Sequence, residues 1–202
     1  PAGKIAVRAD CAPQTIRNLD FDTYFGINAR QKSIFTRRDT LEARAAEPDT
    51  IVVLAVTDAR RIAGFGVFAP PDSDDRWSEM PQGTIKEIEV VEVNSDFRAF
   101  HIAGDMIHKM MMHPGIETMI AFMVGYVWTW DLDGTGLSAA AYRNMLTRLF
   151  RPHGFSEFKT NEPNVCLRPE NLFMARIGSA VSDQLRDDFK YVRFGVPTAH
   201  RA

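Results

Sequence analysis

The chain has 202 residues and a mass of 22.8 kDa, enough for one large domain with a substantial hydrophobic core. Hydrophobic residues make up 45% and charged residues 25%, which excludes a disordered, collagen-like or coiled-coil polypeptide. The chain has 24 Lys and Arg against 26 Asp and Glu, a net charge of −2. It therefore lacks the strongly positive net charge that is typical of a protein whose main function is to bind nucleic acid.

Neither the cysteines nor the apolar segments indicate export or a membrane. Cys11 and Cys166 are far apart and form no Cys-x-x-Cys pair, which favours a reducing compartment. No uncharged apolar run approaches the roughly 20 residues of a membrane span, and residues 1–4 do not resemble the start of a signal peptide. We therefore expect a cytoplasmic protein with no membrane and no nucleic-acid partner.

The first regular elements are expected to be strands. Residues 50–56 are apolar and β-branched, and a polar turn separates them from residues 62–68, which predicts a hairpin. A third strand is expected over residues 84–93, where the carboxylates Glu87, Glu89 and Glu92 interrupt an apolar run. Upstream, residues 13–46 are mixed and charged and are interpreted as one or two helices.

The pattern then changes from strand to helix and back. Apolar residues at helical spacing predict a helix over 102–111, and the apolar run 118–124 predicts a strand buried on both faces. This succession indicates a β-α-β unit with parallel strands. A helix over 137–149 capped by Ser138, a strand at 155–159, an apolar stretch at 171–177 and a last helix ending near Lys190 follow.

These elements predict an α+β fold, layered as in α/β proteins, with a mixed central sheet. We expect an N-terminal helical region at residues 1–45, a central domain at 46–190 and a C-terminal arm at 191–202.

The turn over residues 94–104 leads from the third strand into the helix. The start of a helix offers unpaired N–H groups and the positive end of the helix dipole, which together bind phosphate or pyrophosphate. No Walker lysine and no Gly-x-Gly-x-x-Gly spacing is present, so neither a P-loop nor a dinucleotide fingerprint fits.

This turn resembles the acetyl-CoA motif of the GCN5-related N-acetyltransferases (GNAT), [RQ]-x-x-G-x-[GA] at a helix start. Arg98 and Ala103 match the motif, whereas His101 stands where the family has glycine. The order of strands and helices over residues 50–160 is also similar. The resemblance implies a GNAT fold, with helices on both faces of the sheet and a splayed parallel strand pair that holds the pantetheine arm. It also implies acetyl-CoA as co-substrate, bound by Val91, Val93, Arg98, Ala99, Phe100, His101, Ile102, Ala103 and Gly104.

Four further short sequence motifs are similar to motifs of the acetoin-utilisation acetyltransferase (AcuA-type) family and occur in the same order. They are residues 76–79, 130–137, 142–143 and 174–178. The resemblance covers residues 50–180. It implies a protein lysine acetyltransferase that modifies acetyl-CoA synthetase by direct transfer in a ternary complex.

An acetyltransferase that acts on lysine needs a general base. Lysine has a pKa near 10.4, so exposing the neutral amine at pH 7 costs about 4.6 kcal/mol. Glu87 is the first choice, because it lies eleven residues before Arg98, where several lysine-directed members of the superfamily have a glutamate. Glu92 is the second choice. On pattern alone, a half-exposed strand is the better explanation of Glu87 and Glu89, and the position of Glu87 relative to Arg98 makes the two interpretations comparable.

The resemblance also assigns the remaining steps. The N–H of Val93 would polarise the thioester carbonyl. The superfamily often has a tyrosine that protonates the leaving thiolate, but Phe150 occupies that position here. Tyr142, two turns earlier, or a water is the candidate replacement, although Tyr142 is also interpreted as a packed tyrosine.

Two other functions remain open, namely a small-amine N-acetyltransferase and a non-catalytic acyl-CoA-binding regulatory module, and so does a homodimer. No metal site is expected. His101, His108 and His113 do not share a helical face, and the aspartates at 131 and 133 lack the glutamate that a calcium loop needs.

Overall fold

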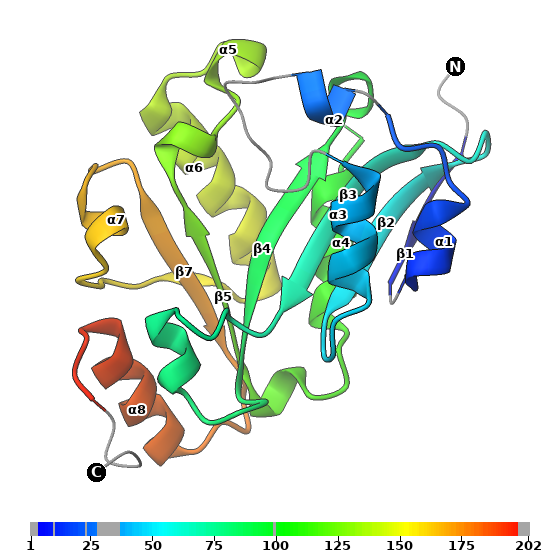
Figure 1. The fold of residues 1–202 in the computed structure, drawn as a ribbon. Helices are drawn as coiled ribbons and strands as arrows, with labels where there is room; N and C mark the ends of the chain where they lie inside the picture. The colour runs from blue at the N-terminus through cyan, green and yellow to red at the C-terminus, as the bar shows by residue number, and fades with distance from the viewer. Residues whose placement is uncertain (1–3, 10, 23, 28–36, 99, 198–202) are drawn as a thin grey trace. The chain divides into compact units, whose positions relative to one another are not determined.

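The computed structural model describes residues 4–9, 11–22, 24–27, 37–98 and 100–197, and its strands form a seven-stranded mixed sheet in the order β1-β2-β3-β4-β5-β7-β6 (Figure 1). The strands are β1 (Ile5–Arg8), β2 (Ile51–Thr57), β3 (Ile62–Ala69), β4 (Ile85–Val93), β5 (Ile120–Gly125), β6 (Ser156–Glu157) and β7 (Leu172–Ile177). The α-helices are α1 (Pro13–Arg17), α2 (Tyr24–Ile27), α3 (Arg38–Ala45), α4 (Ile102–Met111), α5 (Leu132–Thr135), α6 (Ala139–Phe150), α7 (Pro163–Cys166) and α8 (Asp183–Arg193). The predicted α+β fold is confirmed.

The chain divides into two compact units. The first comprises Pro1–Ala69, Glu89–Met112 and Asp133–Thr135, and the second comprises Pro70–Ile88, His113–Leu132 and Gly136–Ala202. Strand β4 therefore contributes to both. The domain limits expected from the sequence, at residues 45/46 and 190/191, stay a prediction.

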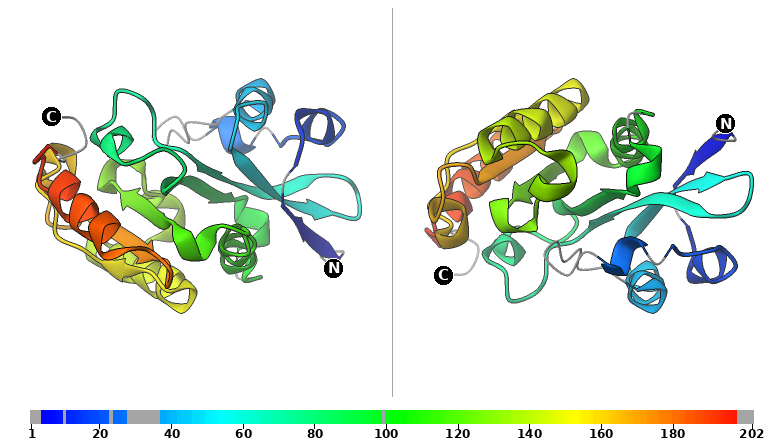
Figure 2. Two further views of the ribbon diagram at one scale, coloured as in Figure 1. Left: turned by 90° about the horizontal axis from the view of Figure 1, so that it is seen from below. Right: turned by 90° about the horizontal axis from the view of Figure 1, so that it is seen from above.

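In the first unit, β2 and β3 form the predicted hairpin, whose antiparallel register pairs Ile51 with Phe68. Helix α4 has the predicted bounds and packs its apolar face against β1, β2 and β3, while α1 and α3 lie on the opposite side of these strands (Figure 2). Two glycines of β3 permit the close approach of its neighbours, the end of β4 and helix α4. A Cβ on Gly64 would lie 2.7 Å from the carbonyl oxygen of Glu92, and one on Gly66 would lie 2.4 Å from Cε of Met110.

The N-terminal region contains more structure than the sequence predicts. It includes the three helices α1, α2 and α3 rather than one or two, and also strand β1, which pairs antiparallel with β2. With only four residues, β1 is too short for its alternation of half-buried and exposed side chains to stand out in the sequence.

A largely buried ion pair joins α3 to β4 within the first unit. The guanidinium of Arg44 contacts the carboxylate of Glu89 through both its Nε, at 3.1 Å from Oε2, and its Nη2. Only 14% and 12% of these two side chains are exposed, and the hydrogen bond to Glu89 raises the pKa of Arg44. Glu89 is thereby a structural carboxylate.

In the second unit, β4 and β5 pair in the predicted parallel direction, with Ile85, Lys86 and Glu87 opposite Ile120, Ala121 and Phe122. Strand β5 also pairs antiparallel with β7. Helices α6 and α8 lie on opposite sides of β5 and β7 (Figure 2).

An aromatic cluster fills the core beneath α8. The ring of Trp77 stacks on Phe173 at a centroid distance of 4.7 Å and an angle of 11°, and Phe122 and Phe189 pack beside them. Each of these four side chains is at most 1% exposed. This packing anchors the residues around Trp77 to the sheet, although they form only a short 3₁₀ helix, Arg76–Glu79.

Several element limits differ from those predicted. Strand β5 starts at Ile120 because residues 116–118 form a 3₁₀ turn, and α8 continues to Arg193 because Val192, 1% exposed, extends its apolar face. Strand β6 has only two residues instead of the expected 155–159. Its continuation turns away where Thr160 Oγ1 and Asn161 N both donate to the Arg193 carbonyl, at 2.7 and 3.2 Å.

The stability of the second unit is expected to depend on Glu117 at low pH. Its Oε2 accepts hydrogen bonds from N and Oγ of Ser179, both at 2.8 Å, and its Oε1 pairs with Arg176. These contacts lower the pKa of Glu117 from 4.5 to about 2. A carboxyl whose pKa is lower in the folded state stabilises the fold above its ordinary pKa, and this contribution disappears as the pH falls towards the lowered value. Urea unfolding should therefore show wild type more stable than Glu117→Gln near neutral pH, with the difference shrinking below about pH 4; a difference independent of pH would contradict this assignment.

Within the part of the chain that the structure describes, no helix is long and apolar enough to cross a membrane. Nor do three His, Cys, Asp or Glu side chains of the described residues come together as a metal site would require.

Candidate active site

The turn between β4 and α4 is held in place by Asn94, which is 1% exposed. Its N–H donates to the Ala63 carbonyl at 2.9 Å, and its side-chain Oδ1 accepts from the N–H of Asp96 at 3.0 Å, which caps the 3₁₀ helix Ser95–Phe97. Both interactions fix the direction in which the chain leaves the strand.

Helix α4 begins with free amide groups. The first hydrogen bond of the helix runs from Asp105 N to the His101 carbonyl at 3.1 Å, so the N–H groups of Ile102, Ala103 and Gly104 are not satisfied within the helix. His101, which precedes the helix, is exposed, and so is Phe100, at 53%. Together with the helix dipole, these amides suit an anionic group such as a diphosphate.

The residues predicted to bind the cofactor differ in their surroundings. Val91 and Val93 are half-buried in β4, Ala103 and Gly104 are half-buried in α4, and Ile102 is buried at 3% exposure. Arg98 is half-buried, and its Nη2 donates to the Tyr24 hydroxyl at 3.0 Å. Ala99 lies outside the described residues.

His101 has the backbone conformation for which the resembling family uses glycine. Its φ of 59° and ψ of 12° are left-handed. A residue with a Cβ pays about 1 kcal/mol for this conformation, so the structure explains both why glycine is usual and why histidine is tolerated.

Replacing His101 therefore tests the backbone directly. His101→Gly should leave the fold as stable or slightly more stable and should retain acetyl-CoA binding, whereas His101→Val should lower the free energy of unfolding by about 1–2 kcal/mol, because a β-branched residue is strained at positive φ. Thermal unfolding and calorimetric titration with acetyl-CoA measure both quantities. Equal stability of the glycine and valine variants would contradict the assigned conformation.

The two candidate bases on β4 lie in different units. Glu87 is half-buried in the second unit and stands opposite Phe122 in the parallel register. Glu92 is half-buried in the first unit, where its carbonyl oxygen packs close to Gly64 of β3. Glu89 is paired with Arg44. Of these three carboxylates, Glu89 therefore has a structural role, which the sequence pattern did not reveal.

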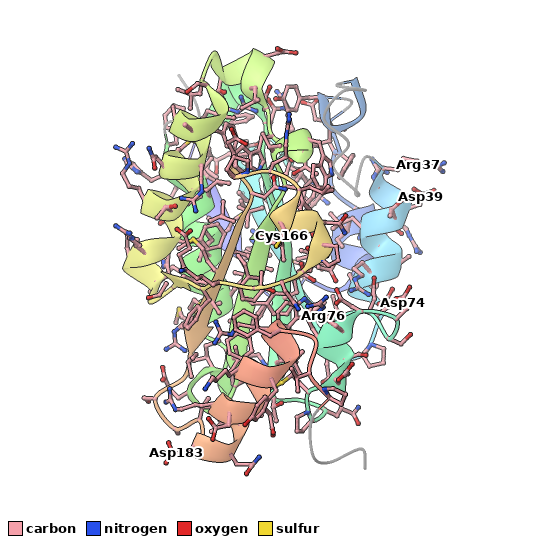
Figure 3. The ribbon with its side chains drawn as sticks, turned by 90° about the vertical axis from the view of Figure 1, so that its left-hand side faces the viewer. Arg37, Asp39, Asp74, Arg76, Cys166 and Asp183 are labelled. Atoms are coloured by element: carbon pink, nitrogen blue, oxygen red, sulfur yellow. The ribbon has the colours of Figure 1, made fainter. Side chains whose placement is uncertain are left out.

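Tyr126, just after β5, reports a negative environment near Glu87. Burial, followed by the charges of Glu162, Glu87 and Asp75, raises the pKa of this half-buried tyrosine, whereas the charge of Arg76 lowers it. Arg76 is itself engaged at the C-terminal end of α8, with its Nη1 2.6 Å from Asn161 Oδ1 and 3.4 Å from the Arg193 carbonyl (Figure 3). A cationic group is favoured in such surroundings.

The two tryptophans of residues 128–130 have different environments. Trp130 is 6% exposed and stacks on Tyr142 at 5.1 Å, whereas Trp128 is 48% exposed and stacks on Tyr126 at 4.7 Å. Trp130 is thus a core residue. Trp128 presents an aromatic face to solvent beside Tyr126.

The candidate general acid is a stacked residue. Tyr142 is half-buried on α6, where its ring lies at 13° to that of Trp130. Phe150, which stands at the position of the missing tyrosine, is 2% exposed and packs edge-on against Phe155 at 5.2 Å. The packing role that the sequence suggests for Tyr142 agrees with these contacts, and its role as an acid stays a prediction.

Sequence reasoning missed the residues that support the turn from the N-terminal region. Asn94 Nδ2 donates to Asp22 Oδ2 at 3.0 Å, and Tyr24 binds Arg98. No local pattern could identify them, because Asp22 and Asn94 are 72 residues apart in the chain.

Comparison with known proteins finds two curated relatives that share the same name. No family model matches the chain. The acetoin utilization protein AcuA of Bacillus licheniformis is 28% identical over 193 residues, which cover 95% of this chain and 90% of that protein. The acetoin utilization protein AcuA of Bacillus subtilis is 31% identical over 150 residues, 74% of this chain and 71% of that protein.

Solved structures agree with these relatives. The crystal structure of an acetoin utilization protein from Exiguobacterium sibiricum is similar with a TM-score of 0.84 and 26% identity, over 95% of this chain and 89% of that one. An acetyltransferase of the GNAT family from Staphylococcus aureus has a TM-score of 0.50 at 12% identity, over 86% and 98% of the two chains. At that identity the likeness shows a common fold.

Proposed function

This chain belongs to the acetoin utilization protein AcuA family and is an N-acetyltransferase of the GNAT fold, and from that premise we propose that it transfers the acetyl group of acetyl-CoA to a lysine of a protein, acetyl-CoA synthetase. The observation that carries this proposal is the extent of the match, which runs through 95% of the chain with the Bacillus licheniformis protein. The acceptor that the AcuA-type resemblance implies is therefore the first to test.

Each step has a candidate group in this chain. The amides of Ile102, Ala103 and Gly104 bind the diphosphate of acetyl-CoA, which supplies the acetyl group as a thioester. The N–H of Val93 donates a hydrogen bond to the thioester carbonyl. Glu87 takes the proton of the acceptor amine, and Glu92 is its alternative.

The leaving group needs less help from the protein. A thiol such as that of CoA has a pKa near 8.5, so the thiolate is a competent leaving group close to neutral pH. Tyr142 or a water then donates a proton to the CoA thiolate. The proposed transfer is direct, with both substrates bound: the acceptor amine attacks the thioester carbonyl and CoA leaves as the thiolate.

A small amine is the second candidate acceptor. The charges of Glu162, Glu87 and Asp75 around Tyr126 attract a polyamine as well as a lysine side chain. The acidic environment therefore supports a cationic acceptor in general, and the family match favours the protein.

One experiment separates the three functions. The chain is incubated with acetyl-CoA and either acetyl-CoA synthetase, spermidine or free amino acids, and the release of CoA thiol is followed together with the mass of each acceptor. Thiol release with one acetylated lysine of the synthetase supports the proposal. Turnover of spermidine or amino acids alone supports a small-amine enzyme, and binding of acetyl-CoA without any turnover supports a regulatory module.

A further inference from the structure

Residues 20–22 and 24–25 of the first unit lie against the start of β3 and against residues 94–98, which precede α4. The Asp20 N–H donates to the Arg60 carbonyl at 3.0 Å, and the Asp20 carbonyl accepts from Ile62 N at 2.8 Å. Phe25 packs on Phe65 of β3 at 5.0 Å. Backbone hydrogen bonds and aromatic packing thus fix both ends of this short segment.

Asp22 occupies the middle of the segment and is the centre of a polar network. Its Oδ1 accepts from Tyr24 N at 2.8 Å, and its Oδ2 accepts from Asn94 Nδ2 at 3.0 Å and pairs with Arg61. Although burial raises the pKa of Asp22, the Tyr24 N–H, the charge of Arg61 and the Asn94 amide outweigh it and lower the pKa below the ordinary 3.8. The carboxylate is therefore ionised at neutral pH and holds donors from three parts of the chain.

Asn94 transmits this contact to the turn. Its Nδ2 is bound to Asp22, and its Oδ1 caps the 3₁₀ helix Ser95–Phe97 through Asp96 N. Because the Asn94 side chain is fully buried, a lost partner is not replaced easily by solvent. Arg61 adds a second link, since it lies over the Phe97 ring at 5.2 Å and approaches Asp96 Oδ2 at 3.4 Å.

Tyr24 makes a separate contact at the far end of the turn. Its hydroxyl accepts the hydrogen bond from Arg98 Nη2 at 3.0 Å. Arg98 is the motif residue that precedes the helix, so its guanidinium is oriented by the N-terminal segment. The two ends of residues 94–98 are thus held from one side, by Asp22 at Asn94 and by Tyr24 at Arg98.

We propose that Asp22 and Tyr24 are positioning residues for acetyl-CoA, which act through Asn94 and Arg98 to hold residues 94–98, before α4, in the conformation that binds the diphosphate. The inference rests on the proposed function, because it takes this turn as the acetyl-CoA site. Holding donors in place before the ligand arrives lowers the entropy lost on binding. The two side chains therefore affect affinity for the cofactor, with no direct part in proton transfer.

The coupling must be reciprocal. If the segment stabilises the binding conformation of the turn, acetyl-CoA stabilises the segment by the same factor. Amide hydrogen exchange at Tyr24 and Phe25, whose N–H groups bond to Asp22 at 2.8 and 3.3 Å, should slow when acetyl-CoA is added to the full chain.

Tyr24→Phe is the most conservative test, because it removes one hydroxyl and keeps the ring. We expect Kd and KM for acetyl-CoA to rise about threefold to tenfold, with kcat unchanged. Tyr191→Phe, an exposed tyrosine on α8, is the matched control and should behave as wild type. In a cycle with Arg98→Met, the double variant should bind no more weakly than Arg98→Met alone, because Tyr24 acts through Arg98.

Asp22→Asn should weaken acetyl-CoA binding about tenfold. The asparagine side chain places an NH₂ group where Asp22 has an acceptor oxygen, so the N–H donors of Asn94 and Arg61 lose their acceptor. Asp187→Asn, an exposed carboxylate on α8, is its control. Thermal unfolding shows whether Asp22→Asn or Tyr24→Phe is misfolded. If Asp22→Asn does not fold, Tyr24→Phe still tests the inference.

The outcomes separate this inference from the function on which it rests. Wild-type chain that fails to bind acetyl-CoA in calorimetric titration overturns both. Wild-type binding with an unchanged Kd in Tyr24→Phe, or additive losses in the cycle with Arg98→Met, overturns the positioning role and leaves the acetyltransferase intact. A loss confined to kcat also overturns it, because that would place Tyr24 in the transfer step.

Discussion

Replacing Glu87 by glutamine is expected to lower the rate of acetyl transfer about a hundredfold or more near neutral pH, with a smaller loss as the pH approaches 10. Glutamine keeps the size of the side chain and its hydrogen-bonding oxygen but cannot accept a proton. At neutral pH only a very small fraction of free lysine is unprotonated, so the enzyme depends on a base. Near pH 10 the amine loses its proton to solvent, and the base contributes less.

The pH profile of kcat/KM measures this effect. Glu92→Gln, the other candidate base, and Glu170→Gln, a carboxylate before β7, serve as comparisons. If Glu87 is the base, only its variant shows a loss that shrinks with rising pH. An equal loss at all pH values would remove Glu87 from proton transfer, and the same profile in Glu92→Gln would assign the role to Glu92.

Gly178→Ala is expected to lower the free energy of unfolding by about 3 kcal/mol and the melting temperature by about 6–12 °C. A Cβ at this position would lie 2.3 Å from the Glu117 carbonyl oxygen and 2.6 Å from that of Ile116. Both are backbone atoms, so no flexible side chain can move aside. The Gly178 N–H also donates to Met119 O at 3.0 Å, and that hydrogen bond must lengthen if the chain shifts.

Gly115→Ala is the matched control. Its nearest neighbours would be side-chain atoms, Cε of Met119 at 3.2 Å and Cε1 of His113 at 3.3 Å, and its φ of −89° suits any residue. Thermal unfolding should show a change of about 2 °C or less. Similar melting temperatures for the two variants would contradict the close backbone contact at Gly178.

Much of the fold follows from local periodicity. Helix α4 has the expected limits because its apolar residues recur at helical spacing, and Ser138 caps α6 as predicted, with its hydroxyl accepting from Ala141 N at 3.2 Å. The parallel direction of β4 and β5 follows from the helix between them. In each case the prediction needs only the spacing of residues or the order of elements along the chain.

The support of the candidate site depends on distant residues and was not predictable. Glu87 and Glu89 alternate in the same strand, and only the docking of α3 reveals that Glu89 pairs with Arg44. Likewise, the hydroxyl of Tyr24 and the guanidinium of Arg98 meet in the fold although the two residues are 74 positions apart in the chain. Hydrogen bonds of this kind carry no periodic signature.

The interleaved composition of the two compact units limits how the chain can be dissected. The first unit ends at Thr135 although the second begins at Pro70. Hence no single cleavage releases either unit whole, and a fragment that stops within residues 70–132 lacks pieces of both. Limited proteolysis followed by mixing of the fragments, rather than truncation, is therefore the way to ask whether the halves can reassemble.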